Sequence, residues 1–167
     1  DVYADLPHLA TPIITDFGRA SIALQWSERE LLRRFESVRS FGVRNIEEFN
    51  IEAKTRNISG LMDEIYSPVP HIVFIIDELS ELIEPNNTLT ETLRTVVKNS
   101  VPLGIHFVLA AQRVNRQIGE FVNSIPNLTK LIAHVPAPFE ARYILDEAAI
   151  GELLSADEML FIDRDAG

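Results

Sequence analysis

Residues 71–78 read His-Ile-Val-Phe-Ile-Ile-Asp-Glu, an apolar run that ends in two acidic residues. An uncharged run of this length, rich in β-branched residues, is typical of a strand that is buried on both faces. Such strands belong to parallel sheets, in which ligands bind at the carboxyl ends of the strands. Asp77 and Glu78 stand at that end and are therefore the first candidates for a functional site.

Segments with the period of a helix alternate with segments with the period of a strand along the rest of the chain. Helices are predicted from the N-cap Asp16 to about Ser40 and over 46–54, 88–100, 117–122, 139–146 and 150–154. Strands are predicted at 71–76, 105–110, 129–135 and 159–162. The alternation predicts an α/β fold in which helices flank a mostly parallel sheet, within one domain of residues 1–167.

The composition limits the classes of protein to consider. The 167 residues include no cysteine, which excludes disulfides and cysteine-ligated metals. No apolar run approaches the roughly 20 residues that cross a bilayer, and no signal peptide opens the chain, so we expect no membrane contact by this segment. The chain begins with Asp1 rather than Met, so we expect an excised or processed segment. The net charge of −10 argues against strong autonomous binding to DNA, although a basic loop or another domain can still contact it.

An apolar strand that ends in two acids is the Walker B arrangement of nucleotide hydrolases. The strand would hold Asp77 at the rim of the sheet, where its carboxylate can hold Mg²⁺ through water beside the nucleotide phosphates. Glu78 can then orient or deprotonate the attacking water. The same acids also suit the start of a helix, with Asp77 as the N-cap and Glu78 in the first turn. This segment alone leaves both interpretations open.

A second polar group follows an apolar strand at 107–113, which reads Phe-Val-Leu-Ala-Ala-Gln-Arg. In a nucleotide hydrolase, Gln112 at this place can sense the terminal phosphate or align water. Alternatively, Gln112 and Arg113 only begin a solvated loop. A phosphate-binding loop, by contrast, is absent, because none of the seven glycines precedes a lysine.

Other polar clusters favour structural roles. The four histidines, His8, His71, His106 and His134, are dispersed and show no metal-ligand spacing. The arginines at 29, 33 and 34 stand among glutamates, which predicts a solvated helix face with i, i+4 pairs. That helix is predicted to be amphipathic, with apolar positions close to a 3.6-residue period that include Ile22, Ala23, Trp26, Leu31, Phe35 and Val38.

Several segments together resemble the FtsK/SpoIIIE family of DNA-pumping ATPases. In order they are residues 3–9, 12–16, 23–26, 30–35, 42–46, 49–50, 72–78, 104–110, 125–126, 142–146, 153–154 and 159–160. Each piece is short, but their common order makes a chance match very improbable, and together they cover nearly the whole chain.

The resemblance implies a RecA-like P-loop NTPase core that lacks the P-loop strand, so that the chain is the Walker B half of a motor domain. Such motors work as rings, usually hexamers, around double-stranded DNA. They use ATP and Mg²⁺ in chromosome segregation and cell division, and the motor portion lies in the cytoplasm even where another part of the protein is anchored in the membrane. By resemblance, Asp77 helps to place Mg-ATP, Glu78 activates water, Gln112 belongs to the sensor strand, and Arg142 lies near a neighbouring subunit's nucleotide.

The chain also departs from the family pattern. Ala111 replaces a threonine, Val101 replaces an arginine and Val114 replaces a proline. Without the P-loop strand we expect an unfilled slot in the sheet and weak binding of Mg-ATP at best by this chain alone. Two alternatives to a DNA motor stay open. One is a motor module of type VII protein secretion, and the other is a degenerate, non-hydrolysing module with a structural role.

Overall fold

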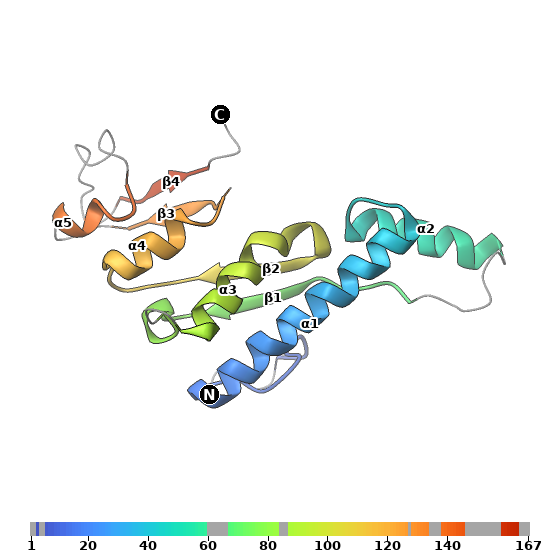
Figure 1. Ribbon diagram of the computed structural model, residues 1–167, viewed down its shortest axis with the longest axis horizontal. Coiled ribbons are helices and arrows are strands. Elements are labelled where there is room, and N and C mark those ends of the chain that lie inside the picture. Colours follow the sequence, from blue (N-terminus) through green and yellow to red (C-terminus); the bar gives the residue numbers. More distant parts are fainter. Residues whose placement is uncertain are drawn as a thin grey trace.

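The computed structural model describes residues 3, 6–59, 67–83, 87–126, 128–133, 138–145 and 158–163. Its elements are α1 (Phe17–Phe41), α2 (Ile46–Ser59), β1 (Ile72–Ile76), η1 (Leu79–Glu81), α3 (Thr88–Asn99), η2 (Val101–Leu103), β2 (Ile105–Leu109), α4 (Arg116–Asn123), β3 (Lys130–Ile132), α5 (Pro138–Ala141) and β4 (Leu160–Ile162). Helix α1 runs beside β1, whereas α4, β3, α5 and β4 gather at the end toward which β1 and β2 run (Figure 1). No helix among these ranges is long and apolar enough to cross a membrane.

Helix α1 begins and ends where its capping residues require. The Asp16 carboxylate accepts a hydrogen bond of 2.9 Å from the Arg19 amide, which confirms the predicted N-cap. Gly42 ends the helix in the left-handed region at φ 70°. The buried face alternates steps of three and four residues and consists of Leu24, Ser27, Leu31, Arg34, Val38 and Phe41.

Three apolar residues predicted for the buried face of α1 are exposed instead. Ile22, Trp26 and Phe35 are exposed by 64%, 44% and 53%. Residues 24, 27, 31, 34, 38 and 41 form one stripe on the helix, and the burial of Ser27 and Arg34 in that stripe could not be inferred from hydrophobicity. The predicted solvated arginine face was therefore wrong for Arg34, which is only 1% exposed.

Strands β1 and β2 pair in parallel, with Ile72 opposite Ile105 and Ile76 opposite Leu109. On one face the rings of Phe74 and Phe107 stack with centroids 4.9 Å apart, and hydrophobic residues of α1 and α3 belong to the clusters packed there. The opposite face presents its side chains to solvent, with Val73, Ile75 and Val108 exposed by 57%, 75% and 53%. The prediction that both faces would be buried fails for the described residues, because helices cover only one of them.

Strands β3 and β4 form a second pair, which is antiparallel and has Leu131 opposite Phe161. They do not extend the β1–β2 ladder within the described parts of the chain. Strand β3 is shorter than predicted, and the expected helix at 150–154 lies outside the described residues. The Lys130 ammonium is nearly buried and donates 3.0 Å hydrogen bonds to the Asn123 side chain and the Ile144 carbonyl, which ties β3 to the elements beside it.

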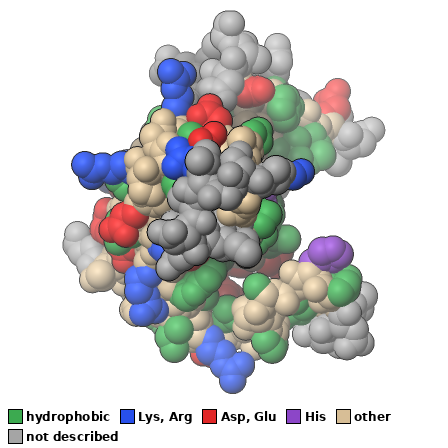
Figure 2. All heavy atoms as spheres, turned by 90° about the vertical axis from the view of Figure 1, so that its right-hand side faces the viewer, with side chains coloured by type: hydrophobic (Ala, Val, Ile, Leu, Met, Phe, Trp, Pro, Cys, Tyr) green, Lys and Arg blue, Asp and Glu red, His purple; other side chains and the backbone are tan. Residues whose placement is uncertain are grey.

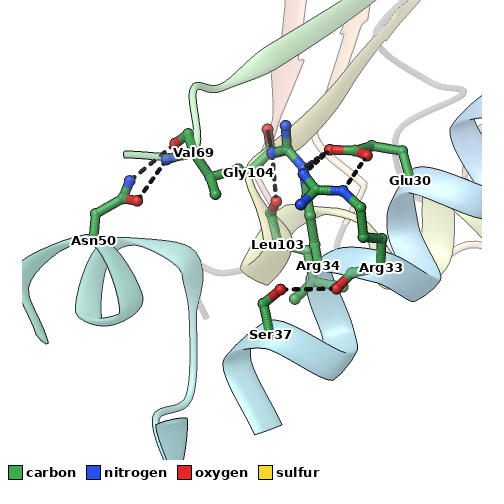
Figure 3. A network of polar contacts seen from close by, with 8 residues as sticks. All are labelled: Glu30, Arg33, Arg34, Ser37, Asn50, Val69, Leu103 and Gly104. Carbon is green, nitrogen blue, oxygen red and sulfur yellow. Dashed lines mark hydrogen bonds and ion pairs between the residues drawn. The ribbon is translucent and has the colours of Figure 1, made fainter. Parts of the chain in front are cut away.

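Arg34 joins α1 to the beginning of β2 (Figure 3). Its guanidinium donates to Glu30 at 2.8 Å, to the Leu103 carbonyl at 2.8 Å and to the Gly104 carbonyl at 3.1 Å. Nearby, the Asn50 side chain bonds both the amide and the carbonyl of Val69, at 2.8 Å and 2.9 Å. These contacts set the positions of α1 and α2 at the amino-terminal end of the parallel strands, opposite the predicted site.

Candidate ATP-hydrolysis site

The candidate site lies at the carboxyl ends of β1 and β2, which are held together beyond the ladder itself. The Ala110 amide donates to the Ile76 carbonyl at 2.8 Å, and the Leu79 amide donates to the Ala110 carbonyl at 2.7 Å. Leu79 is only 2% exposed and belongs to the hydrophobic core. The backbone that carries the two acids is therefore anchored on one side by the sheet and on the other by the core.

Both carboxylate oxygens of Glu78 are hydrogen-bonded. Oε1 accepts from the Ser80 hydroxyl at 2.5 Å and from the Ser80 amide at 3.2 Å. Oε2 accepts from the Gln112 amide at 3.2 Å. Glu78 thus connects the turn after β1 with the turn after β2, and it also caps η1.

These donors stabilise the ionised form of Glu78. The Ser80 hydroxyl, followed by the Gln112 amide, lowers the pKa of Glu78 below its ordinary value, because hydrogen bonds to a carboxylate favour its charged state. Glu78 is therefore ionised at neutral pH and able to accept a proton. The alternative interpretation, in which these acids begin a helix, holds in a modified form. The N-cap of η1 is Glu78 rather than Asp77.

Asp77 is exposed directly after β1. Its carboxylate has no hydrogen bond or ion pair with any described residue, so its oxygens are available to a cation or to water around one. Mg²⁺ is usually held by one or two carboxylates together with water and substrate phosphates rather than by a protein cage. No three His, Asp or Glu side chains form a metal-holding group in the described ranges. Asp77 therefore suits an ion held together with water and phosphates, and not a cage of protein ligands.

The predicted site residues fall into two groups. Glu78 and Gln112 are in contact through the Gln112 backbone, and Asp77 adjoins Glu78 in the chain. The Gln112 side chain is exposed. Arg142 lies in the turn that follows α5. In Figure 1, α5 lies beside the β3–β4 pair and apart from the ends of β1 and β2. The catalytic roles of these site residues remain predictions.

Sequence reasoning missed Ser80, although a hydroxyl two residues after an acid is a recognisable local hydrogen-bonding signal. It also did not bring His71 and His106 together. Their Nδ1 and Nε2 atoms lie 2.9 Å apart, while the ring centroids are 5.2 Å apart. The centroid distance exceeds the nitrogen distance by about the width of one imidazole ring, as expected when both nitrogens lie between the ring centres. The contact is therefore an in-plane hydrogen bond and not a face-to-face stack. Nε2 of His71 lies 3.3 Å from the Glu47 carboxylate.

Comparison with known proteins gives the chain's relatives. The family model described as the FtsK/SpoIIIE family matches residues 1–116. DNA translocase FtsK of Tropheryma whipplei is 34% identical over 169 residues, which cover 99% of this chain and 22% of that protein. DNA translocase SftA of Bacillus subtilis is 32% identical over 169 residues, which cover 99% of this chain and 17% of that protein. The chain therefore spans about a fifth of the length of these curated relatives.

Two solved structures share the fold. The conjugation coupling protein TcpA of pCW3, in its monomer form with ATPgS, has a TM-score of 0.70 at 18% identity, over 92% of this chain and 43% of that one. The cytoplasmic domain of the type VII secretion ATPase EccC of Thermomonospora curvata has a TM-score of 0.60 at 20% identity, over 86% of this chain and 16% of that one. They confirm the α/β, RecA-like fold. Since the family model covers well over half of the sequence, this chain belongs to the FtsK/SpoIIIE family.

Proposed function

We propose that this chain is the Walker B half of an ATP-driven motor that moves double-stranded DNA. The observation that carries the proposal is the hydrogen bond of 3.2 Å between the Gln112 amide and Glu78. It joins an acid at the end of β1 to the sensor position at the end of its parallel neighbour β2. The names of the relatives, which are DNA translocases, support DNA as the substrate that is moved.

In this proposal each polar residue has a distinct task. The carboxylate of Asp77 would hold the water shell of a Mg²⁺ ion, which would neutralise charge on the ATP phosphates when bound. Ionised Glu78 accepts a proton from the water that attacks the γ-phosphate. Gln112 reports the state of that phosphate to Glu78 through its own backbone. Arg142 contributes to the nucleotide of a neighbouring subunit.

The proposed assembly is a hexameric ring in the cytoplasm that acts in chromosome segregation and cell division. The net charge of −10 means that general electrostatic attraction cannot hold DNA to this chain. On the face drawn in Figure 2, Lys and Arg side chains stand in several separate places, with acidic side chains among them. Local basic residues, or other parts of the protein, would then make the DNA contacts.

The exposed face of the β1–β2 pair supports the idea that another segment of the protein completes the motor domain. Val73, Ile75 and Val108 form an apolar surface at the centre of the pair, and a lasting apolar patch of this kind is unusual on a finished domain. β1 pairs only with β2 among the described strands. A phosphate-binding-loop strand beside β1, with its following helix, would complete the ladder and cover this face.

Each alternative has one observation in its favour. The fold likeness to EccC favours a secretion motor, although the relatives at 34% and 32% identity are DNA translocases. Ala111, which has no hydroxyl and packs against the core, favours a module that does not hydrolyse ATP. Turnover separates this last alternative from both motors.

The deciding experiment measures Mg-dependent ATP turnover, with and without duplex DNA, by the full-length natural protein that contains this chain. The same protein carrying Glu78→Gln is the comparison, since Gln keeps the shape of Glu and loses the base. The proposal is supported if duplex DNA stimulates turnover and the Glu78→Gln substitution abolishes it. If both proteins are folded and neither hydrolyses ATP, the structural module is the better explanation. Equal turnover in both would remove Glu78 from the mechanism.

Nucleotide binding by the 167-residue chain itself gives a second test. Its acids repel phosphates unless a cation and a cradle of backbone amides compensate. We therefore expect calorimetry to show weak or undetectable binding of Mg-ATP. Tight binding of one ATP per chain would contradict the assignment of the phosphate cradle to another part of the protein.

A further inference from the structure

The two oxygens of Glu78 have unequal surroundings. Oε1 accepts two hydrogen bonds, both from Ser80, whereas Oε2 accepts one, from the Gln112 amide. An ionised carboxylate offers about two acceptor sites on each oxygen. Oε1 is therefore saturated, and Oε2 keeps one site to which a water molecule can donate.

Ser80 holds Oε1 from a well-anchored position. Its backbone lies in η1, whose first residue, Leu79, is buried in the core and donates its amide to the Ala110 carbonyl at 2.7 Å. An ionised carboxylate can only accept hydrogen bonds, so the Ser80 hydroxyl is the donor in the 2.5 Å contact. A short bond from a neutral donor to a charged acceptor restricts rotation of the Glu78 carboxylate.

We propose that Ser80 is a positioning residue for ATP hydrolysis, which occupies Oε1 of Glu78 and leaves Oε2 as the oxygen that receives the proton. This inference rests on the function proposed above. In the step, the water oxygen bonds to the γ-phosphorus, the bond from that phosphorus to the ADP oxygen breaks, and the water proton passes to Oε2. Ser80 touches neither ATP nor water in this arrangement and acts only through Glu78.

Loss of the hydroxyl has a specific expected effect. In Ser80→Ala the amide still donates to Oε1, but the shortest contact is gone and the carboxylate can turn. Misplacement of a catalytic group typically lowers rates by about 10- to 100-fold. Because Ser80 does not bind the nucleotide, kcat should fall by about that factor while the KM for ATP stays within about twofold. Ser80→Thr retains the hydroxyl and should recover most of kcat.

The experiment compares four variants of the full-length natural protein in ATP turnover: Ser80→Ala, Ser80→Thr, Glu78→Gln and Ser37→Ala. The last is a matched control, since the Ser37 hydroxyl bonds a helix carbonyl of α1 at 3.0 Å. Low kcat in Ser80→Ala alone among the three serine variants supports the inference. Wild-type kcat in Ser80→Ala beside an inactive Glu78→Gln overturns it, as does a Ser80→Thr that is as slow as Ser80→Ala. An active Glu78→Gln would remove Glu78 from the mechanism proposed above, and the role of Ser80 with it.

A spectroscopic readout separates these failures. In the 167-residue chain, the carboxyl ¹³C resonance of Glu78 should move in Ser80→Ala and stay in place in Ser37→Ala. An unchanged resonance in Ser80→Ala would overturn the positioning role whatever the turnover shows. A moved resonance with an active Glu78→Gln would mean that the hydrogen bond exists but that Glu78 is not the base.

Discussion

Nη1 of Arg34 donates a hydrogen bond of 2.8 Å to the carbonyl oxygen of Leu103, a residue 69 positions further along the chain. The arginine is 1% exposed, so its charged side chain lies inside the protein together with its hydrogen-bond acceptors. This contact locks α1 to the turn that begins β2. It gives the parallel strand pair a fixed support on the side away from the candidate site.

Replacing Arg34 by Met should lower the free energy of unfolding by about 2 kcal/mol, because the buried Leu103 carbonyl loses this donor and Glu30 loses its buried partner. Arg33→Met is the matched control, since the Arg33 side chain is 57% exposed and such pairs contribute at most about 1 kcal/mol. Urea unfolding followed by circular dichroism measures the free energy of unfolding of both variants. Equal effects of the two substitutions would contradict the special role of Arg34.

Gly104→Ala should be much more damaging than Gly42→Ala. Both glycines lie in the left-handed region, at φ 69° and φ 70°, where an alanine costs about 1–2 kcal/mol. At Gly104 an added Cβ would also lie 2.8 Å from Ile46 Cγ2 and 3.2 Å from Arg34 Nη1, whereas at Gly42 it would meet nothing within 4 Å. Thermal unfolding of the two variants tests this. The expectation fails if Gly42→Ala unfolds at the same or a lower temperature.

Acid should weaken the fold through Glu30. The Arg33 side chain, followed by Arg34, holds the pKa of Glu30 below its ordinary value of 4.5. A carboxylate with a lowered folded-state pKa stabilises the protein fully above its unfolded-state pKa, and this stability disappears as the pH falls through the folded-state value. The free energy of unfolding should therefore fall below about pH 4.5, and less steeply in Glu30→Gln. Glu36→Gln, at an exposed position of the same helix, is the control. An unchanged slope in Glu30→Gln would show that this ion pair does not contribute.

The histidine pair should have defined tautomers. Because Nε2 of His71 lies 3.3 Å from the Glu47 carboxylate, that carboxylate favours a proton on Nε2, which leaves Nδ1 to accept from Nε2 of His106. Two-bond ¹H–¹⁵N correlation spectra at pH 8 should show both rings protonated on Nε2. In Glu47→Ala the preference of His71 should weaken. A proton on Nδ1 of His106 in the unaltered chain would rule out this direction of the hydrogen bonds.

The apolar face of the strand pair can be probed with a thiol, since the chain contains no cysteine. Ile75→Cys places a thiol at a position that is 75% exposed, and Ile51→Cys places one at a position on α2 that is 68% exposed. Both should react rapidly with a maleimide in the 167-residue chain. In the full-length protein the reaction at position 75 should slow by about tenfold or more while position 51 stays reactive. Equal rates at position 75 in the two proteins would leave the proposed cover of this face without support.

Local patterns predicted the elements of the fold well. The N-cap Asp16, the uncharged run 72–76 and the glycine after α1 each act through contacts within a few residues, so the boundaries of α1 and β1 follow from the sequence. The pair Asp77 and Glu78 was located at the end of a strand for the same reason. What failed was the choice of faces, because Trp26 and Phe35 are apolar and yet exposed, and hydrophobicity alone does not say which stripe meets a partner.

Four features follow from the order of the residues alone: the α/β alternation, the position of the acids after β1, the polar Gln112 after β2 and the family resemblance. Three features became apparent only in the folded protein: the hydrogen bond between Glu78 and the Gln112 backbone, the burial of Arg34, and the contact between His71 and His106. Strand pairing and helix packing bring together residues that lie 34 to 70 positions apart. Such contacts depend on the register and the crossing of whole elements, and this information is absent from any short stretch of sequence.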